Sequence, residues 1–335
     1  MVVSVRSSLF FALASLLVTT TTGIAGGSMR IRDNLYSVAA VDAQNVWAVG
    51  AFGTIFHSTD GGTSWRQQES NTKEQLFGVS FADASHGWAV GRTGTVLYTK
   101  DGGRIWTKQE TGNEQHLFDV AALGTRTAVA IGDWGTILTT TDGGASWNDV
   151  TFSRDVILNS QSWVDAAHGW IVAEAGVVLM TGDGGKTWTE QPSGVDKTLF
   201  GVYFRNVDQG WATGLDGLIL QTADGGRTWQ VQRGIAEMQT FDEYSFAETL
   251  GNPALFDISF AGNYGWAVGD LGALFVSKDG GQTWARLESS SESQLQWIRA
   301  VSLAEGGTGV FVGAKGLVGS LNGGKLIEGS ADHAP

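Results

Sequence analysis

The stretch HGWAVGRTGTVLYTKDGGRIW at 86–106 decides the fold. Its second half, TKDGGRIW, has five close copies along the chain: STDGGTSW at 58–65, TTDGGASW at 140–147, TGDGGKTW at 181–188, TADGGRTW at 222–229 and SKDGGQTW at 277–284. The aspartates of these boxes are spaced by 41 residues four times and then by 55; they are Asp60, Asp101, Asp142, Asp183, Asp224 and Asp279. A weaker seventh copy, SLNGGKL at 320–326, has Asn322 in place of aspartate. Seven copies of a unit near 41 residues match the length of a four-stranded propeller blade.

Each unit carries four strand signals in a fixed order. In the second copy they are LFGVSF at 76–81, GWAVG at 87–91, TVLYT at 95–99 and IWTKQE at 105–110. The first alternates large apolar and smaller residues with a period of two, and the others are short, β-branched or aromatic, and bounded by glycine. A single four-stranded unit cannot bury both faces, so the units must stack around an axis. The sequence therefore predicts an all-β, seven-bladed β-propeller of four-stranded blades with Asp-box hairpins.

The repeat also sets the predicted domain boundaries. The propeller spans 35–327, after a lead-in at 26–34 and before a tail at 328–335. Its blades are expected to start near 35, 76, 117, 158, 199, 255 and 297.

The first 25 residues have the pattern of a secretory signal peptide. Arg6 is their only charged residue, Leu9 to Val18 is apolar apart from Ser15, and small residues stand at Gly23 and Ala25. An apolar run this short cannot cross a bilayer, which takes roughly 20 helical residues. We expect cleavage near Ala25 and an exported product with no direct membrane span. The alternative is that these residues form the first strand or helix of the mature fold.

The composition excludes several classes of function. The chain has no Cys, which rules out a disulfide scaffold, a thiolate metal site and a Cys nucleophile. Its net charge of −13 argues against nucleic acid and anionic membranes as partners. The 48 Gly and 14 Trp fall mostly in the repeated hairpins and GW positions, so they describe architecture and not activity.

The boxes are expected to be structural. Two glycines allow positive φ in a tight hairpin, and the Asp carboxylate can accept hydrogen bonds from backbone N–H groups of its own turn. Carboxylates repeated around a ring cannot form one active site. Metal binding is the weaker alternative, because each turn offers only one acid. We expect no catalytic residues, no metal and no cofactor.

The combined pattern resembles a known family. The box resembles the Asp box, also called the bacterial neuraminidase repeat. Together with the upstream HGWAVGRTGTVLYT it is similar to the photosystem II stability/assembly factor family of seven-bladed propellers. Matching segments are NVWAVGAFGTIFHS at 45–58, GWIVAEAGVVLMT at 169–181, GWATGLDGLILQT at 210–222 and GWAVGDLGALFVS at 265–277. The resemblance covers roughly 35 to 327, essentially the whole mature chain.

What the resemblance implies is a function in assembly. Family members act as assembly chaperones in the thylakoid lumen and also occur as exported proteins in bacteria without photosynthesis. This implies a protein client, such as a subunit of a membrane complex, met in the periplasm, or in the thylakoid lumen of a photosynthetic source. We expect the propeller to work as a monomer. The family's partner surface is arginine-rich, and here only Arg92 matches it at the turn position.

Residues that differ between copies of a strict repeat indicate where a partner can be recognised. The turns after each GWAVG lie on one face of a propeller, opposite the box turns, and blade-to-blade connections share that face. The predicted partner-binding residues there are Arg92, Asp133, Trp134, Arg154, Glu174, Asp216, Arg233, Asp270 and Lys315. The alternative for each is a solvated turn residue, and for Arg154 and Arg233 a scatter of surface charge.

Two departures from the repeat add to this hypothesis. The segment 232–254 holds the extra residues between Asp224 and Asp279, with Phe241 and Tyr244 among acidic neighbours. It is either a docking loop or lid for the partner, or a tolerated loop excursion.

The other departure is in blade four, whose inner strand reads LNSQSW at 158–163. Asn159 and Gln161 replace apolar residues there. Buried amides need partners, so we expect both to line a water-filled axial channel; a ligand site is the alternative.

An enzyme or glycan-binding protein is the rival class. A sialidase-like hydrolase needs an arginine cluster, a Tyr nucleophile with a Glu partner, and an acid. The residue types are present in Arg92, Arg154, Arg233, Glu243 and Tyr244, but no spacing brings them together. The five His show no metal-ligand spacing, and no glycine-rich element follows the phosphate-loop pattern. We therefore expect a non-catalytic binding protein.

Overall fold

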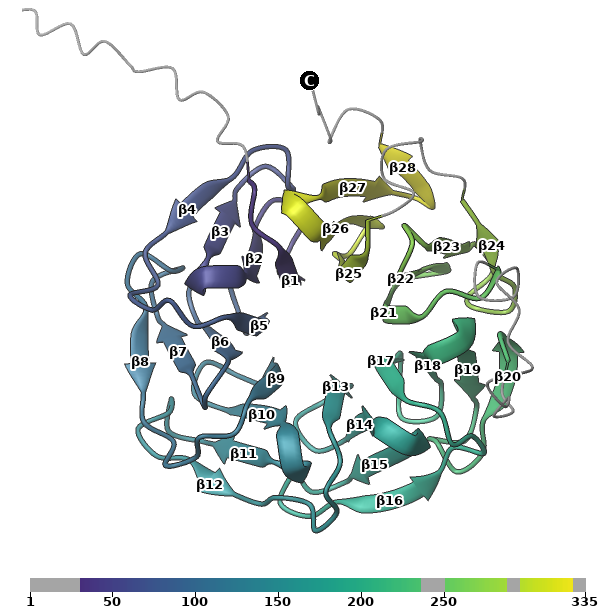
Figure 1. Cartoon of the computed structure of the whole chain (residues 1–335), viewed down its shortest axis with the longest axis horizontal. Coiled ribbons are helices and arrows are strands. Elements are labelled where there is room, and N and C mark those ends of the chain that lie inside the picture. Colours follow the sequence, from purple (N-terminus) through teal and green to yellow (C-terminus); the bar gives the residue numbers. More distant parts are fainter. Residues whose placement is uncertain (1–30, 236–250, 288–295, 328–335) are drawn as a thin grey trace, which may run out of the picture.

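The computed structural model describes residues 31–235, 251–287 and 296–327. The strands in these ranges form seven four-stranded antiparallel sheets, set around an axis as the blades of a propeller (Figure 1). Each blade uses four consecutive strands, so that blade 1 is β1–β4 and blade 7 is β25–β28. The predicted all-β, seven-bladed propeller is confirmed.

The first two strands of each blade form its inner half, with the first strand nearest the axis (Figure 1). The innermost strands are β1 (Leu35–Ala40), β5 (Leu76–Phe81), β9 (Leu117–Ala122), β13 (Leu158–Trp163), β17 (Leu199–Phe204), β21 (Leu255–Ala261) and β25 (Ile298–Leu303). The second strands are β2 (Val46–Gly50), β6 (Gly87–Gly91), β10 (Ala128–Gly132), β14 (Gly169–Ala173), β18 (Gly210–Gly214), β22 (Tyr264–Gly269) and β26 (Thr308–Gly313).

The outer half of each blade is shorter and more exposed. The third strands are β3 (Ile55–Ser58), β7 (Val96–Thr99), β11 (Ile137–Thr140), β15 (Val177–Thr181), β19 (Ile219–Thr222), β23 (Leu274–Ser277) and β27 (Val318–Asn322). The outermost are β4 (Arg66–Gln68), β8 (Thr107–Gln109), β12 (Asn148–Asp149), β16 (Thr189–Pro192), β20 (Gln230–Arg233), β24 (Ala285–Arg286) and β28 (Lys325–Ile327). Short 3-10 turns link second to third strands: η1 (Ala51–Gly53), η2 (Asp133–Gly135), η3 (Glu174–Gly176), η4 (Leu215–Gly217) and η6 (Ala314–Gly316).

A β-bulge occurs near the start of every inner strand. In blade 1 the pairing with β2 passes from Leu35 to Ser37 and skips the residue between them. The same shift recurs in the other six blades. A bulge re-aims the side chain of the extra residue, and here every skipped residue lines a cavity on the propeller axis. These residues are Tyr36, Phe77, Phe118, Asn159, Phe200, Phe256 and Arg299.

The hydrophobic core lies between the blades. The tryptophans of the GW positions, such as Trp170, are fully buried and each contributes a large apolar area. Trp170 of blade 4 stacks on Phe204 of blade 5, with ring centroids 3.7 Å apart, and Trp229 meets Phe204 edge-on. One blade alone would leave these rings in water, so closing the ring stabilises every blade.

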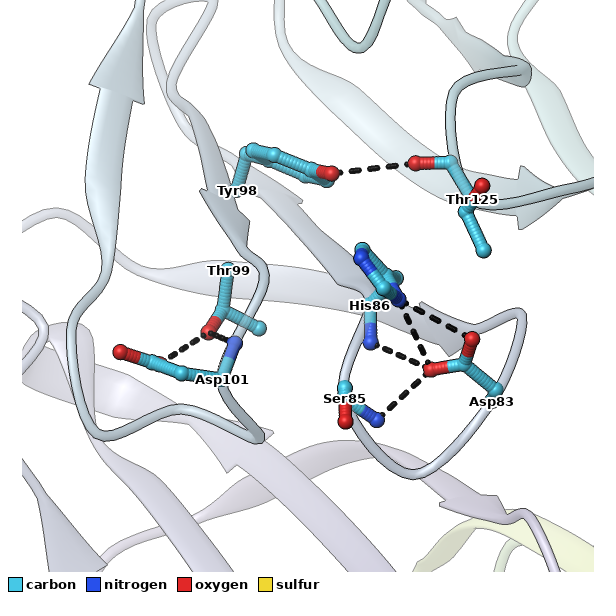
Figure 2. Close-up of polar contacts among 7 residues, drawn as sticks. All are labelled: Asp83, Ser85, His86, Tyr98, Thr99, Asp101 and Thr125. Atoms are coloured by element: carbon cyan, nitrogen blue, oxygen red, sulfur yellow. Dashed lines mark hydrogen bonds and ion pairs between the residues drawn. The ribbon is translucent and has the colours of Figure 1, made fainter.

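The box turns close each blade on one face. In the first box the Asp60 carboxylate accepts hydrogen bonds from the Ser58 hydroxyl at 2.8 Å and from the Ser64 backbone N–H at 2.8 Å. The Ser58 hydroxyl in turn accepts the N–H of Gly62, whose φ is +90°. These are the contacts that a structural function of the box requires, and Figure 2 shows the matching pair Thr99 and Asp101 in blade 2.

Polar side chains tie each blade to the next on this box face. The buried amide of Gln68 on β4 donates to the Gly102 carbonyl at 2.8 Å and accepts from the Trp106 indole at 3.1 Å. Gln109 on β8 makes the same two contacts with blade 3. The Tyr98 hydroxyl also crosses from blade 2 to donate to the Thr125 carbonyl at 3.0 Å (Figure 2).

The ring closes where blade 7 meets blade 1. Because no strand is exchanged between them, closure depends on side-by-side packing of β25 and β26 against β1. The Ala40 N–H donates to the Ser302 hydroxyl at 3.0 Å, and the Lys315 N–H donates to the Asn34 side-chain oxygen at 2.9 Å.

Candidate functional site: the turn face

The turns that join second to third strands gather on one face of the ring, here called the turn face. They occupy 51–53, 92–94, 133–135, 174–176, 215–217, 270–272 and 314–316. The first turn residue donates its N–H to the residue just before the inner strand, as in Ala51 to Asn34 at 2.9 Å and Arg92 to Gln75 at 2.9 Å. The box turns instead contact the connections between first and second strands, as Gly61 does with Gln44 at 2.9 Å. The two sets of turns therefore lie on opposite faces, as the repeat predicts.

The middle residue of each turn has a left-handed backbone although none is glycine. The seven φ values lie between 51° and 58°, and the residues are Phe52, Thr93, Trp134, Ala175, Asp216, Leu271 and Lys315. This conformation costs a residue with a Cβ about 1 kcal/mol. Two of the residues also place large apolar side chains in water, since Phe52 is 72% exposed and Trp134 is 58% exposed. The left-handed backbone recurs in all seven turns and belongs to the fold, so it is the exposed aromatic side chains that make these two positions candidates for partner contact.

Trp134 and three charged residues occupy equivalent turns of the consecutive blades 2 to 4, a set here called the arc. Arg92 is exposed in the blade 2 turn, and Asp133 and Glu174 are half-buried in the turns of blades 3 and 4. The structure thus brings four of the predicted partner-binding residues, including Trp134, into one arc. Around the propeller, a cation in blade 2 is followed by an aromatic side chain and a carboxylate in blade 3 and a carboxylate in blade 4.

Local hydrogen bonds hold this arc in place. The His116 imidazole accepts the Thr93 N–H at 3.2 Å through Nδ1, and the His116 carbonyl accepts the Asp133 N–H at 2.9 Å. Glu174 accepts the Ile157 N–H at 3.1 Å. His116 therefore connects the turns of blades 2 and 3.

The Asp133 carboxyl is perturbed by this environment. Burial raises its pKa, the nearby His116 opposes that shift, and the negative charge of Glu174 adds to it. A half-buried carboxylate beside an exposed indole is suited to charge-assisted contacts with a partner that removes the remaining water.

The other predicted arginines have contacts within the fold. Arg154 pairs with Glu190 at 2.5 Å, and both side chains remain more than 40% exposed. Arg233 donates to the carbonyls of Gly217 at 2.8 Å and Gly251 at 2.7 Å, and its guanidinium lies 4.1 Å from the centre of the Phe275 ring. Arg233 thus connects the end of β20 to the blade 5 turn and to Gly251.

Charged residues on the opposite side of the turn face form a second group. Asp216 pairs with Lys197, whose side chain is 3% exposed. Asp270 accepts the Leu271 N–H at 2.8 Å, and Lys315 is exposed beside the blade 7 to blade 1 closure. The predicted docking residues Phe241 and Tyr244 lie outside the described residues, as does Glu243.

The two amides of blade four have different environments. Asn159 lines the axial cavity, and its amide donates to the Leu199 carbonyl at 2.8 Å. Gln161 does not line the cavity, which corrects the prediction for that residue. Its amide donates to the Val129 carbonyl at 3.0 Å and accepts from the Trp163 indole at 2.8 Å, so it joins blades 3 and 4.

The described residues contain no group of three or more His, Asp or Glu arranged to hold a metal ion. Within the same ranges, no helix has the length and apolar character needed to span a membrane. The arginines required by the sialidase alternative occupy blades 2, 3 and 5, and the last two are engaged as described above.

Three residues of the turn face and the axis were not predicted from the sequence. His116, Lys197 and Arg299 each act through neighbours that are distant in sequence. Aligning the repeats signals Arg299, since it stands where five other blades carry an aromatic residue. No comparable signal marks His116 or Lys197.

Comparisons with known proteins agree with the propeller fold. The family model described as photosynthesis system II assembly factor YCF48 matches residues 63–156 and 191–295. A solved structure titled "YCF48 bound to D1 peptide" superposes with a TM-score of 0.69 at 21% identity, covering 88% of this chain and 95% of that one. YCF48 from Cyanidioschyzon merolae gives 0.68 at 19% identity, covering 88% and 97%.

The fold is also shared beyond this family. The GH74 xyloglucanase from Xanthomonas campestris superposes with a TM-score of 0.67 at 12% identity, covering 88% of this chain and 53% of that one. No curated protein sequence matches the chain. Because the YCF48 model covers more than half of the sequence, the chain belongs to the photosynthesis system II assembly factor YCF48 family.

Proposed function

We propose that this chain is an exported, non-catalytic assembly or stability factor whose turn face binds a protein subunit of a membrane complex. Family membership supports a protein client, and a related propeller has been solved with a D1 peptide. The compartment follows from the signal-peptide pattern at 1–25: the periplasm, or the thylakoid lumen of a photosynthetic source.

The observation that carries the proposal is Trp134. Its ring is 58% exposed, so a large apolar side chain lies in water without contributing to the core. Tryptophan and arginine are the residues most often found to dominate binding energy at interfaces. Arg92, in the adjacent turn, gives the client a cation to contact, while Asp133 and Glu174 select against acidic groups at the other end of the arc.

Capture of subunits from solubilised membranes tests the proposal. The mature chain is immobilised and compared with the double variant Arg92→Gln/Trp134→Gly. We expect a membrane-complex subunit to be retained by the unaltered chain and lost from the variant. A matched control, Arg227→Gln on the box face, should retain it. Equal recovery on all three would contradict a binding site on the turn face.

Export has its own test. The N-terminal sequence of protein recovered from the extracytoplasmic fraction should begin near residue 26. Recovery of the intact chain from the cytoplasm would contradict export without affecting the client-binding site.

A further inference from the structure

The axis of the propeller carries a second site, separate from the turn residues. A cavity of about 330 Å³ is lined by the bulged residues of all seven inner strands. Five of these are aromatic and form a collar: Tyr36, Phe77, Phe118, Phe200 and Phe256. Neighbouring rings touch, with centroids 5.7 Å apart for Tyr36 and Phe77 and 5.4 Å apart for Phe77 and Phe118. Ligand pockets in proteins begin at roughly this size, which suits a small molecule and excludes a folded partner.

Arg299 interrupts the collar in blade 7. Its guanidinium lies 5.2 Å from the centre of the Phe256 ring, where a cation–π contact stabilises it. Within the described ranges it has no hydrogen-bond acceptor and no carboxylate within ion-pair distance. A deeply placed guanidinium has five N–H donors, and leaving them without acceptors is costly. Arg299 therefore lines the cavity with guanidinium donors that have no hydrogen-bond acceptor among the described residues.

Two carboxylates face the same cavity. Asp119 accepts the N–H groups of Val120 at 2.8 Å and Gln161 at 2.9 Å. Asp257 does the same with Ile258 at 2.8 Å and Val301 at 2.8 Å. Each carboxylate therefore holds its blade to the next, and its remaining lone pairs are free to meet a ligand. Burial lowers the pKa of Arg299, and the negative charges of Asp257 and Asp119 oppose that shift.

The arrangement selects a ligand with both signs of charge. An isolated anion would meet the two carboxylates, and an isolated amine would meet the guanidinium. A ligand with an ammonium and a carboxylate on one carbon would pair with the cavity carboxylates and with the guanidinium. An apolar side chain on that carbon would pack against the aromatic collar. We propose that the axial cavity binds a small zwitterion of the α-amino acid type, its carboxylate on Arg299, its ammonium toward Asp119 and Asp257, and its side chain among the collar rings.

The aromatic collar lies near the turn-face end of the inner strands. The collar residues follow directly after the chain that receives the turn N–H groups, as Tyr36 follows Asn34 and Leu35. A bound zwitterion would thus lie on the axis among the collar residues, without sharing a residue with the arc around Trp134.

Calorimetric titration of the mature chain with L-phenylalanine tests the proposal. We expect saturable binding, and at least tenfold weaker binding of 3-phenylpropionate, which lacks the ammonium, and of phenethylamine, which lacks the carboxylate. Arg299→Gln should weaken L-phenylalanine binding about tenfold or more, as expected for loss of a charge-assisted pair. Arg227→Gln on the box face is the matched control and should leave the affinity unchanged.

A second variant keeps the test decisive if Arg299→Gln fails to fold. Phe118→Leu retains an apolar side chain in the collar and should weaken L-phenylalanine binding several-fold. Three results would each overturn the proposal: no binding of L-phenylalanine or L-leucine at millimolar concentration, equal binding of 3-phenylpropionate, or unchanged affinity in both cavity variants. Loss of client capture alone would contradict the proposed function and leave this site standing.

Discussion

Phe52 and Trp134 occupy the same turn position two blades apart, with φ of 58° and 57° and side chains that are 72% and 58% exposed. Both therefore combine an unfavourable backbone with an unfavourable surface. The two turn neighbours of Trp134 have opposite charges, Arg92 in blade 2 and Glu174 in blade 4, and its own turn carries Asp133. The neighbours of Phe52, Arg92 in blade 2 and Lys315 in blade 7, are both cations, and its own turn has no charged residue. Both residues share the cost of the left-handed backbone. We assign partner binding to the side chain of Trp134 alone.

Trp134→Gly is expected to leave the propeller as stable or to stabilise it by up to about 1 kcal/mol, because glycine adopts this backbone without strain. Phe52→Gly should behave alike, since its environment matches. Urea unfolding of both variants measures the effect. A loss of more than about 2 kcal/mol for Trp134→Gly would show that the indole supports the fold, contrary to our assignment.

The interblade amides give a stability prediction on the opposite face. Gln68→Leu removes the acceptor of the Trp106 indole and the donor to Gly102, so the free energy of unfolding should fall by about 2 kcal/mol. Gln67→Leu, the exposed neighbour on β4, is the control and should change it by less than about 0.5 kcal/mol. Equal effects would mean that the Gln68 contacts add no net stability.

The axial carboxyls predict a stability that falls as the solution becomes alkaline. Burial raises the pKa of Asp119 to about 7 and that of Asp257 to about 6, against the opposing effect of their backbone N–H donors and of Arg299. Groups whose folded pKa is raised contribute fully below the unfolded pKa, and the contribution is lost as pH rises through the folded value. Stability should therefore decline between about pH 5 and pH 8.

The box aspartates give the protein's stability the opposite pH dependence, a loss in acid. Hydrogen bonds from Thr187 hold the pKa of Asp183 at about 2, so its contribution is present above the unfolded value and lost on strong acidification. Urea midpoints from pH 3 to pH 8.5 should show a maximum in the mildly acidic range. Asp119→Asn should flatten the alkaline limb, and Asp208→Asn, an exposed control, should not. A stability that rises steadily to pH 8 would contradict the account.

Much of the fold could be predicted because the repeat specifies it locally. The box at 99–106 fixes a hairpin, GW positions such as Trp88 fix the core, and the near-constant spacing fixes the blade number. These features depend on residues close in sequence, which is why the pattern alone indicates seven four-stranded blades.

The site was less predictable because its residues act across blades. Arg233 donates to Gly217 of the blade 5 turn and to Gly251, contacts that no local pattern shows. Gln161 was expected in the channel, but the side-chain alternation that follows the bulge at Asn159 turns it between blades 3 and 4. The bulge itself, which aims Arg299 into the cavity, has no single sequence signal.

The most direct test of client binding is calorimetric titration of the mature chain with a synthetic D1 peptide, the ligand named for the related YCF48 structure. We predict saturable binding that Trp134→Gly weakens by about thirtyfold and Arg92→Gln by about tenfold. Phe118→Leu in the axial cavity should bind the peptide as the unaltered chain does. Peptide affinity that is the same in the Trp134 and Arg92 variants as in the unaltered chain would contradict the central claim that the turn face is the client site.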